Sequence, residues 1–245
     1  MEQETKDQKT TSNGINPQYL IPGSILIAGV VVAFAIMYTT GGGKGGAKPL
    51  PNDGQAAAVA ASGDAAALLE AREGDYVLGN PAATVTFVEF GDFQCPFCGR
   101  FYETTEKELI EKYVKTGKVK FIWRDFAFLG KESFWAAEAA RCAGDQGKFW
   151  DYHDHLFEQQ RGENQGVFSN RNLKRFADEL KLDTDLFNTC LDSGKYRDAV
   201  EEESRLGREL GVSGTPSSFI NGRNITGAVP FSSLEPIILD ALEER

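Results

Sequence analysis

The sequence is poor in the sulfur and nitrogen side chains that bind metals. It has four cysteines and two histidines in 245 residues, and its single Cys-X-X-Cys pair is Cys95 and Cys98. The other two cysteines stand alone and neither histidine has a cysteine nearby; these residues are Cys142, Cys190, His153 and His155. A structural zinc site usually needs a second pair of ligands at short spacing. The composition therefore argues against a zinc-binding module, and we expect neither a metal nor a cofactor.

Positive charge is also scarce. The chain has 26 Lys and Arg against 36 Asp and Glu, a net charge of −10. Proteins that bind nucleic acids present a basic face to the phosphates. The charge balance therefore argues against a nucleic-acid partner.

Long uncharged apolar runs are missing except for one near the N-terminus, Tyr19 to Tyr38. About twenty such residues span a bilayer core as a helix, so we predict a transmembrane anchor at 19–40. The alternative is a cleaved signal peptide, with Ala33-Phe34-Ala35 as the best cleavage motif. That motif lies inside the apolar run rather than after it, and the tail at 1–18 is not clearly basic, which favours a retained anchor.

Gly and Ala dominate the segment that follows the predicted anchor. Such a composition is typical of a flexible linker, which we assign to 41–74. The composition then changes to that of a folded domain, which we predict at 75–245. Lys6 and Lys9 precede the apolar run and Lys44 and Lys48 follow it, so the flanking charges do not set an orientation.

The most informative stretch is TVTFVEFGDFQCPFCGR, residues 84–100. Its first half is β-branched and aromatic, which predicts a buried strand. Gly91 and Asp92 end that strand, and a helical pattern begins at the Cys-X-X-Cys pair. At a helix N-terminus, backbone N–H groups and the helix dipole favour a thiolate at Cys95, while Pro96 fits the first turn. The thiolate is the nucleophile in disulfide exchange, so Cys95 is the candidate attacking group and Cys98 the resolving one.

The remaining pattern predicts further elements of an α/β domain. We expect strands at 76–78 and 118–126, a hairpin turning at Asn221-Gly222, and a last helix from Phe231 to Glu244. Helical spacing fills the stretch between Gly130 and Gly211, in five segments with the bounds 133–142, 148–160, 169–180, 183–192 and 196–210. Ser169 and Asp183 are placed to cap two of these helices. His153 and His155 are two residues apart on one predicted helix, so they cannot share a face of it. We expect each to be an ordinary surface or hydrogen-bonded histidine.

Two blocks carry a resemblance to a known family. FVEFGDFQCPFCGRF, together with GVSGTPSSFING at 211–222, resembles the DsbA-like family of thioredoxin-fold disulfide oxidoreductases, particularly its membrane-anchored bacterial members. The resemblance covers about 75–245. It implies a thioredoxin fold of the α/β class with a helical insertion at about 130–211, preceded here by one transmembrane helix and a flexible linker.

The resemblance adds roles around the cysteine pair. An acidic residue at the place of Glu89 sits beneath the disulfide in this family, where a carboxyl with a raised pKa accepts and returns the proton of Cys98. The alternative from strand phase is a solvent-facing Glu89. Thr215-Pro216 resembles the family's cis-proline loop, which offers backbone groups to a client peptide. Phe97 departs from the family, whose strongest oxidants have His there, and this predicts a milder oxidant.

The resemblance also bears on the two other cysteines. Cys142 and Cys190 are each flanked by apolar residues in predicted helices. Some DsbA-like proteins carry a second, non-catalytic pair in this region, which implies a structural disulfide here. The alternative is two buried free thiols that pack as small apolar groups.

These observations lead to a functional hypothesis and two alternatives. The hypothesis is a membrane-tethered enzyme that introduces disulfides into reduced extracytoplasmic client proteins and is reoxidised by a quinone-linked thiol oxidase in the membrane. The alternatives are a reductase or isomerase with the same site, or a client-binding chaperone module without catalysis. Disulfide exchange belongs outside the reducing cytoplasm. We therefore expect a cytoplasmic N-terminus and an extracytoplasmic domain.

Overall fold

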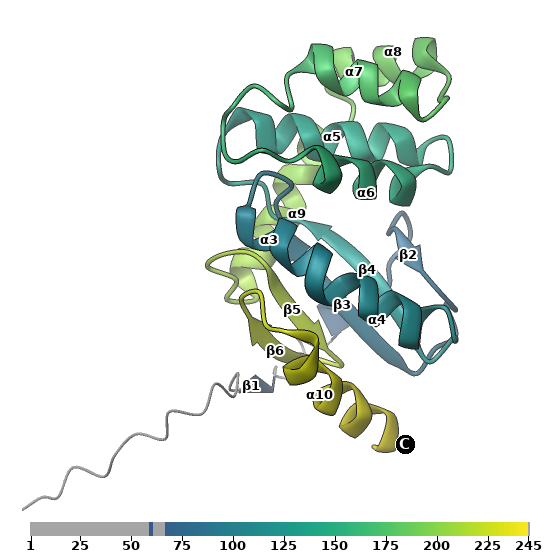
Figure 1. Cartoon of the computed structure of the whole chain (residues 1–245), viewed down its shortest axis with the longest axis vertical. Helices are drawn as coiled ribbons and strands as arrows, with labels where there is room; N and C mark the ends of the chain where they lie inside the picture. The colour runs from purple at the N-terminus through teal and green to yellow at the C-terminus, as the bar shows by residue number, and fades with distance from the viewer. Residues whose placement is uncertain (1–58, 61–66, 245) are drawn as a thin grey trace, which may run out of the picture. The chain divides into compact units, whose positions relative to one another are not determined.

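The computed structural model describes residues 59–60 and 67–244 (Figure 1). The predicted tail at 1–18, the predicted anchor at 19–40 and most of the predicted linker at 41–74 lie outside the described residues. Within the described part of the chain, no helix is both long enough and apolar enough to cross a bilayer.

The centre of the folded part is a six-stranded mixed sheet in the order β1-β6-β5-β3-β4-β2. The strands are β1 (Val59–Ala60), β2 (Val77–Leu78), β3 (Val85–Gly91), β4 (Val119–Asp125), β5 (Ser217–Ile220) and β6 (Arg223–Thr226). The central strands β3 and β4 run parallel, and the other neighbouring pairs are antiparallel. Every residue of β3 is buried, as expected for a strand covered on both faces.

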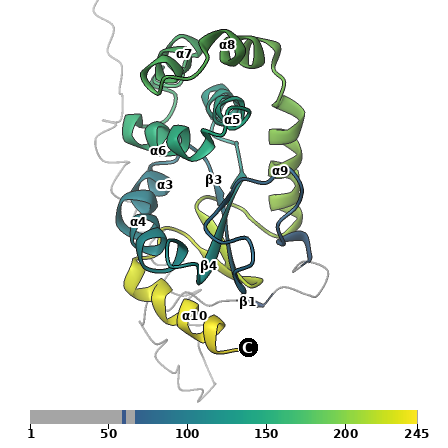
Figure 2. The ribbon, with the colours of Figure 1, turned by 90° about the vertical axis from the view of Figure 1, so that its right-hand side faces the viewer.

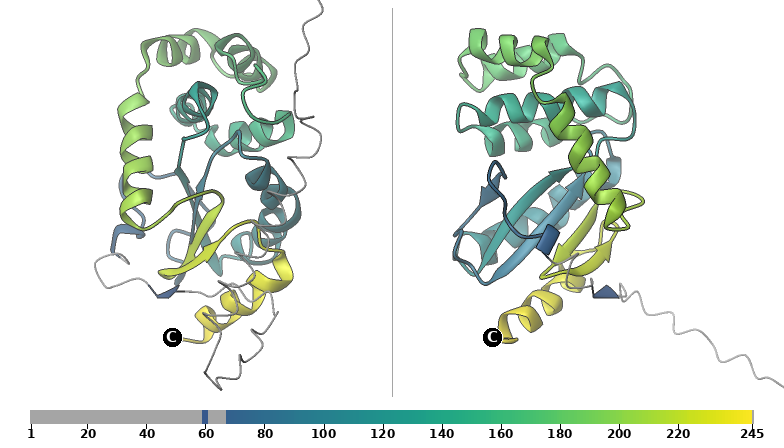
Figure 3. Two further views of the ribbon diagram at one scale, coloured as in Figure 1. Left: turned by 90° about the vertical axis from the view of Figure 1, so that its left-hand side faces the viewer. Right: turned by 180° about the vertical axis from the view of Figure 1, so that it is seen from behind.

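Helices cover both faces of this sheet (Figure 2). One face carries the helix that follows β3 and the C-terminal helix α10 (Phe231–Glu243), and side chains such as Phe87, Leu109 and Leu234 form one cluster there. The opposite face carries α9 (Arg197–Glu209), as the views of Figure 3 also show. Gly207 of α9 packs so tightly that an added Cβ would lie 2.6 Å from Phe126. This is the layered α/β arrangement predicted for a thioredoxin fold.

Between β4 and β5 the chain forms the predicted helical insertion. Its helices are α5 (Lys131–Gly144), α6 (Phe149–Gln159), α7 (Asn170–Glu179), α8 (Thr184–Ser193) and α9. The first four lie together beyond one end of the sheet (Figure 1). Their apolar side chains join Phe93, Cys98 and Trp123 in a single buried cluster, so the insertion shares its core with the end of the central strands.

The helix that follows β3 differs from the predicted regular helix. It consists of α3 (Pro96–Phe101), the π-helical turn η2 (Tyr102–Glu106), α4 (Lys107–Leu109) and a second π turn, η3 (Ile110–Val114). A π turn holds more residues than an α turn and rotates the helix face that follows it. Tyr102, Thr105 and Glu106 are all buried in the first of these π turns, and Thr105 donates a hydrogen bond to the carbonyl oxygen of Val229 at 2.8 Å.

The predicted hairpin joins β5 and β6. Asn221 and Gly222 both have positive φ angles, 45° and 86°, which suits the Asn-Gly pair of a two-residue turn. The side chain of Asn221 accepts a hydrogen bond from the backbone N–H of Thr86 at 2.8 Å. The hairpin is thereby fixed to the start of β3.

Of the two predicted helix caps, one is confirmed. The Asp183 carboxylate accepts hydrogen bonds from the N–H groups of Asp185 and Leu186 at the start of α8. Ser169 occupies the N-cap position of α7, but its side chain makes no capping bond. The prediction therefore placed the start of α7 correctly at Ser169 but was wrong that the Ser169 side chain caps it.

Two described parts of the segment predicted as a linker contact the folded part. β1 pairs with β6 at the sheet edge, and Leu69 is buried in a cluster with Val88 and Phe90. The division into tail, anchor, linker and domain stays a prediction.

A buried ion-pair network fixes the beginning of the domain to the sheet. The guanidinium of Arg124 is fully buried and binds Asp75 at 2.7 Å and Glu203 at 3.1 Å. Arg141 binds Asp125 and Glu203, each at 2.6 Å. Each buried charge thus has an opposite partner, without which its desolvation would be costly.

Candidate active site

The Cys-X-X-Cys pair lies where the central strand β3 ends and α3 begins. The turn between them is held by Asp92, whose buried carboxylate accepts hydrogen bonds from the N–H groups of Gln94 at 2.8 Å and Phe128 at 3.0 Å. Cys95 is the N-cap residue of α3, and Pro96 is the first residue of the helix. Proline suits that position because its missing N–H has no partner to lose.

The second block of the family resemblance meets the first at Cys95. The Thr215-Pro216 peptide bond is cis, and the Cys95 sulfur lies 3.3 Å from the carbonyl oxygen of Thr215, to which it donates when it is protonated. The fold therefore brings together residues separated by 120 positions in the sequence. A backbone carbonyl next to the reactive sulfur is well placed to receive an extended peptide.

The environment of Cys95 favours its thiolate. Its pKa is lowered from 9.0 to about 6, and the largest cause is a hydrogen bond from the thiol of Cys98. The side chain of Thr215 and the backbone N–H groups of Cys98 and Phe97 act in the same direction, while burial opposes them. Near neutral pH, Cys95 is therefore mostly the nucleophilic thiolate.

Cys98 has the opposite character. It is fully buried, and burial raises its pKa well above 9.0, with the hydrogen bond to Cys95 and the charge of that thiolate as further causes. Cys98 is thus a neutral thiol that donates to its partner. Both sulfurs are free thiols in the structure, which represents the reduced pair.

Glu89 lies on the buried central strand beneath the pair. It is opposite Trp123 in β4 and Ser218 in β5, is fully buried, and neither carboxylate oxygen has a hydrogen-bond partner among the described residues. Burial raises its pKa well above 4.5, and the Cys95 charge raises it further. The alternative of a solvent-facing Glu89 is wrong, because both faces of β3 are covered.

Phe97 projects from the same helical turn towards solvent. Its side chain is 56% exposed, unusual for a large apolar group, and the Arg100 guanidinium lies 4.9 Å from its ring centroid. An exposed aromatic ring beside a reactive sulfur offers apolar contact area to a client.

A glutamine from the insertion supports the active-site turn. Gln160, at the end of α6, donates hydrogen bonds from Nε2 to the carbonyl oxygens of Phe93 at 2.6 Å and Cys95 at 3.0 Å. An added Cβ on Gly99 would lie 2.4 Å from its Oε1, so Gly99 makes room for this side chain. No sequence pattern indicated this role, since a glutamine at a helix end has many uses.

Sequence reasoning also missed a buried polar group behind the pair. Glu106 of η2 and His153 of α6 are both fully buried, and Glu106 Oε1 lies 4.0 Å from His153 Nε2. His153 was expected to be an ordinary surface or hydrogen-bonded residue. Its Nδ1 is hydrogen-bonded to Asp154, but the ring is fully buried and its Nε2 has no hydrogen-bond partner among the described residues. His155, two residues on, is the ordinary case and contacts Glu179 at 3.1 Å.

Asp154 completes this group without making it a metal centre. Ligand atoms of Glu106, His153 and Asp154 lie within 4.8 Å of one another. However, Asp154 Oδ1 contacts the Nδ1 side of the imidazole at 3.0 Å, while Glu106 faces Nε2. One ion cannot use both ring nitrogens, so the geometry fits a row of polar groups on either side of the imidazole better than a set of ligands around one ion.

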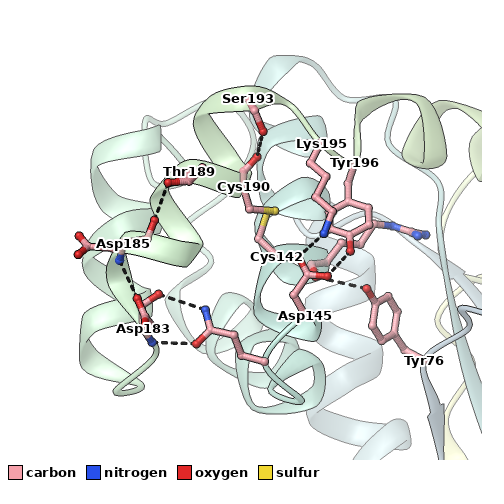
Figure 4. The surroundings of a disulfide bond; sticks show 12 residues. Tyr76, Cys142, Asp145, Asp183, Asp185, Thr189, Cys190, Ser193, Lys195 and Tyr196 are labelled. Carbon is pink, nitrogen blue, oxygen red and sulfur yellow. Dashed lines mark hydrogen bonds and ion pairs between the residues drawn. A yellow bond between two sulfur atoms is a disulfide. The ribbon is translucent and has the colours of Figure 1, made fainter.

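The remaining cysteines are joined to each other, away from the active pair. Cys142 of α5 and Cys190 of α8 form a disulfide with a Cα–Cα distance of 5.8 Å (Figure 4). Next to it Lys195 binds Asp145 at 2.7 Å, which ties the end of α8 to the end of α5. The disulfide links two insertion helices and leaves Cys95 and Cys98 as the free thiols of the chain's four cysteines.

Comparison with known proteins places the chain in a family. Residues 71–240 match the thioredoxin family, and the chain belongs to it. It is 30% identical to the disulfide bond formation protein D of Bacillus subtilis, over 71% of this chain and 79% of that protein. The crystal structure of oxidised BdbD from Bacillus subtilis superposes with a TM-score of 0.67 at 29% identity, covering 71% of this chain and 96% of that chain. The predicted membership of a DsbA-like, thioredoxin-fold family is confirmed.

A different kind of relative also matches. The chain is 34% identical over 169 residues to the Na⁺/H⁺ antiporter NhaA 1 of Salinispora arenicola, which is 68% of this chain. The matched part is only 24% of the antiporter. The similarity therefore concerns a minor part of that protein.

Proposed function

We propose that this protein is a thiol–disulfide oxidoreductase that introduces disulfides into extracytoplasmic proteins. The observation that carries the proposal is the opposite shift of two neighbouring thiols, with the pKa of Cys95 lowered to about 6 and that of Cys98 raised. The two sulfurs therefore have different roles in disulfide exchange. Cys95 forms and releases the mixed disulfide with the client, and Cys98 resolves it. The similarity to disulfide bond formation protein D supports the same activity.

The reaction moves two electrons from the client to the pair. In the oxidised protein, a client thiolate attacks Cys95 Sγ, a mixed disulfide forms, and Cys98 leaves as a thiolate that takes up a proton. A second client thiolate then attacks the client sulfur of the mixed disulfide. The client disulfide forms, and Cys95 leaves as the thiolate that its surroundings stabilise.

Glu89 and the cis-proline loop have separate roles in this proposal. Glu89 lies beneath the pair with a raised pKa, so it can donate a proton to the departing Cys98 and take it back on reoxidation. The Thr215 carbonyl receives a backbone N–H of the extended client, Pro216 holds that carbonyl beside Cys95, and Phe97 adds apolar contact.

The tether belongs to the same proposal. Residues 19–40 anchor the protein, 1–18 lie in the cytoplasm, and 41–74 link the anchor to the domain at 75–245. The apolar run and the Gly/Ala-rich composition support this division. Because the pair must be reoxidised after each turnover, we assign a quinone-linked thiol oxidase of the membrane as its electron acceptor.

The proposal is tested with the domain in its anchored form in detergent. Oxidised protein is mixed with reduced, unfolded ribonuclease, and client disulfides are counted together with the redox potential of the pair. We expect stoichiometric client oxidation, lost in Cys95→Ser. The Cys142→Ser/Cys190→Ser double variant is the control, because that disulfide lies outside the pair and client oxidation should persist.

Other results identify the alternatives. A wild-type protein that only reduces or rearranges client disulfides, with a low redox potential, would be a reductase or isomerase. Client binding that survives in Cys95→Ser, in the absence of any wild-type redox activity, would indicate a chaperone module.

A further inference from the structure

The proposed reaction leaves a proton problem at Cys98. This sulfur is fully buried and has a raised pKa, so each reduction brings one proton to it and each reoxidation removes one. Glu89 beneath it is equally buried. A proton held on Glu89 must therefore still travel to solvent.

A second fully buried carboxyl, Glu106, lies in η2 of the helix that follows the cysteine pair. Both of its oxygens lack hydrogen-bond partners among the described residues, as do those of Glu89. Burial raises the pKa of Glu106 well above 4.5, and the charge of Glu89 raises it further. Trp123 connects the two regions, because it lies opposite Glu89 in β4 and its ring centroid is 4.7 Å from that of His153, the residue that Glu106 faces. Uncompensated buried carboxyls are costly, and two in one place require a functional explanation.

The far side of Glu106 faces His153. Its Oε1 lies 4.0 Å from Nε2 of the ring, a gap that a small side-chain movement or one bridging water closes. On the other side of the ring, Nδ1 contacts Asp154 at 3.0 Å. The Asp154 side chain is 49% exposed, so the chain of groups ends at solvent.

The walls around this route are aromatic. Six rings have centroids within 6.2 Å of the His153 ring: Phe93, Tyr102, Trp123, Phe149, Trp150 and Phe157. Trp123 is also the β4 residue opposite Glu89. Such walls exclude bulk water, so the polar groups between them are the path that the structure offers to a proton.

We propose that Glu106, His153 and Asp154 form a proton relay that connects Glu89, and through it Cys98, to solvent. This inference rests on the proposed disulfide exchange. When the pair is reduced, a proton passes inward from Asp154 through the ring and Glu106 to Glu89 and Cys98. On reoxidation the same route carries it outward, and every group returns to its starting state.

The charged neighbours fit such a route. Glu106 is faced by Glu89 from β3, by Asp154 from α6 and by Lys107 of its own helix, and Lys107 alone lowers its pKa. For His153, burial lowers the pKa, while Asp154 and Asp125 of β4 raise it. Among the described residues, no permanent positive charge is buried with Glu106 to hold its carboxylate ionised. Both shifts favour the uncharged forms of Glu106 and His153, the acid and the imidazole between which a proton would move.

The test compares rates at the cysteine pair in three relay variants, Glu106→Gln, His153→Gln and Asp154→Asn. Each variant is reduced and then reoxidised with oxidised glutathione across the pH range, in H₂O and D₂O, with tryptophan fluorescence as the readout. We expect Glu106→Gln and His153→Gln to slow reoxidation by about a hundredfold, the lower end of what a positioned acid–base group contributes. Asp154→Asn, at the exposed end, should slow it less.

Two further measurements separate a relay from a structural role. Small buffers such as imidazole or formate should restore the Glu106→Gln rate with increasing concentration, and Glu106→Asp should restore it in part. The pH dependence of Cys95 alkylation should keep its midpoint, because the nucleophile is not on the route. Glu138→Gln is the matched control, since Glu138 is a buried glutamate paired with Arg197 on another helix.

The outcomes are distinct. A wild-type protein without client oxidation contradicts the proposed function. An active wild type with Glu106→Gln and Asp154→Asn rates equal to the Glu138→Gln rate, or with slow rates that no buffer restores, overturns the relay and leaves the proposed function standing. His153→Gln can lose stability because its site is buried, so the other two variants decide the outcome.

Discussion

Cys95 and Cys98 have identical side chains three positions apart, but their surroundings shift the two thiol pKa values in opposite directions. Cys95 occupies the N-cap position of α3, where the Cys98 thiol and nearby backbone N–H groups stabilise its thiolate. Cys98 is one turn further on, inside the helix and against the core. Stabilising the first as an anion and the second as a thiol makes Cys95 a good leaving group, which favours transfer of the disulfide to a client.

Alkylation measures this difference directly. We expect iodoacetamide to label Cys95 of the reduced protein with a pH midpoint of about 6, because the thiolate is the reacting form. Cys98 should stay unlabelled through neutral pH. Mass spectrometry of tryptic peptides measures both sites in one sample. Equal labelling of the two cysteines at every pH would contradict the assignment of Cys95 as the nucleophile.

Glu89 should make stability fall as pH rises. Its pKa in the folded protein is raised above 4.5, so between the two pKa values the folded state holds more protons than the unfolded chain. The free energy of unfolding then decreases with pH, by up to about 1.4 kcal/mol per pH unit for one proton. Glu89→Gln removes the carboxyl group and with it this decrease in the free energy of unfolding. We expect the variant to be more stable than wild type at neutral pH and equal to it near pH 4.

Urea unfolding of the reduced proteins at several pH values measures this effect. Glu111→Gln is the control, because it removes a charge from a side chain that is 69% exposed, and its stability should track that of wild type. If Glu89→Gln is less stable than wild type at neutral pH, the carboxylate is compensated in a way that the structure does not show.

At the scale of elements, the sequence predicted what periodic patterns encode. The strands, the insertion helices and the Asn221-Gly222 hairpin follow from alternation, helical spacing and turn chemistry, and they are present. The π turns were missed, because an extra residue in a helical turn leaves no mark in a single sequence. The first of them contains the buried residues Tyr102, Thr105 and Glu106, so the missed turn carries a carboxyl of the proposed relay.

The disulfide between α5 and α8 is a prediction at this scale. It closes a loop with a sequence separation of 48, and the chain-entropy model gives about 4 kcal/mol for such a loop. We expect Cys142→Ser/Cys190→Ser to melt about 8–16 °C below wild type, at about 2–4 °C per kcal/mol for a domain of this size. Differential scanning calorimetry without reductant measures it.

Reductant provides the internal check on that result. Reduction should lower the melting temperature of wild type in the same direction, whereas the double variant should not respond through this bond. Non-reducing peptide mapping of Cys95→Ser/Cys98→Ser protein should recover Cys142 and Cys190 as one cross-linked peptide. Recovery of both as free thiols would refute the pairing.

At the scale of the molecule, the insertion completes the active site. α6 reaches back to the sheet, so that Gln160 binds the turn at Cys95 and His153 lies behind Trp123. The sequence predicted the cysteine pair because its residues are adjacent to each other and follow a strand. It could not place Gln160 or His153, which reach the site only when helices separated from Cys95 by some sixty residues pack against it.

The tether is the remaining prediction at this scale. Disulfide donation fails in a reducing compartment, so the proposed function requires the domain beyond the anchor to lie outside the cytoplasm, and the flanking charges set no orientation of their own. We expect protease added to spheroplasts to remove the domain at 75–245 and to spare an epitope placed at 1–18. Detergent lysis is the control, after which both should be digested. A domain that survives until lysis would place Cys95 and Cys98 in the cytoplasm, and the site would then have to act as a reductase.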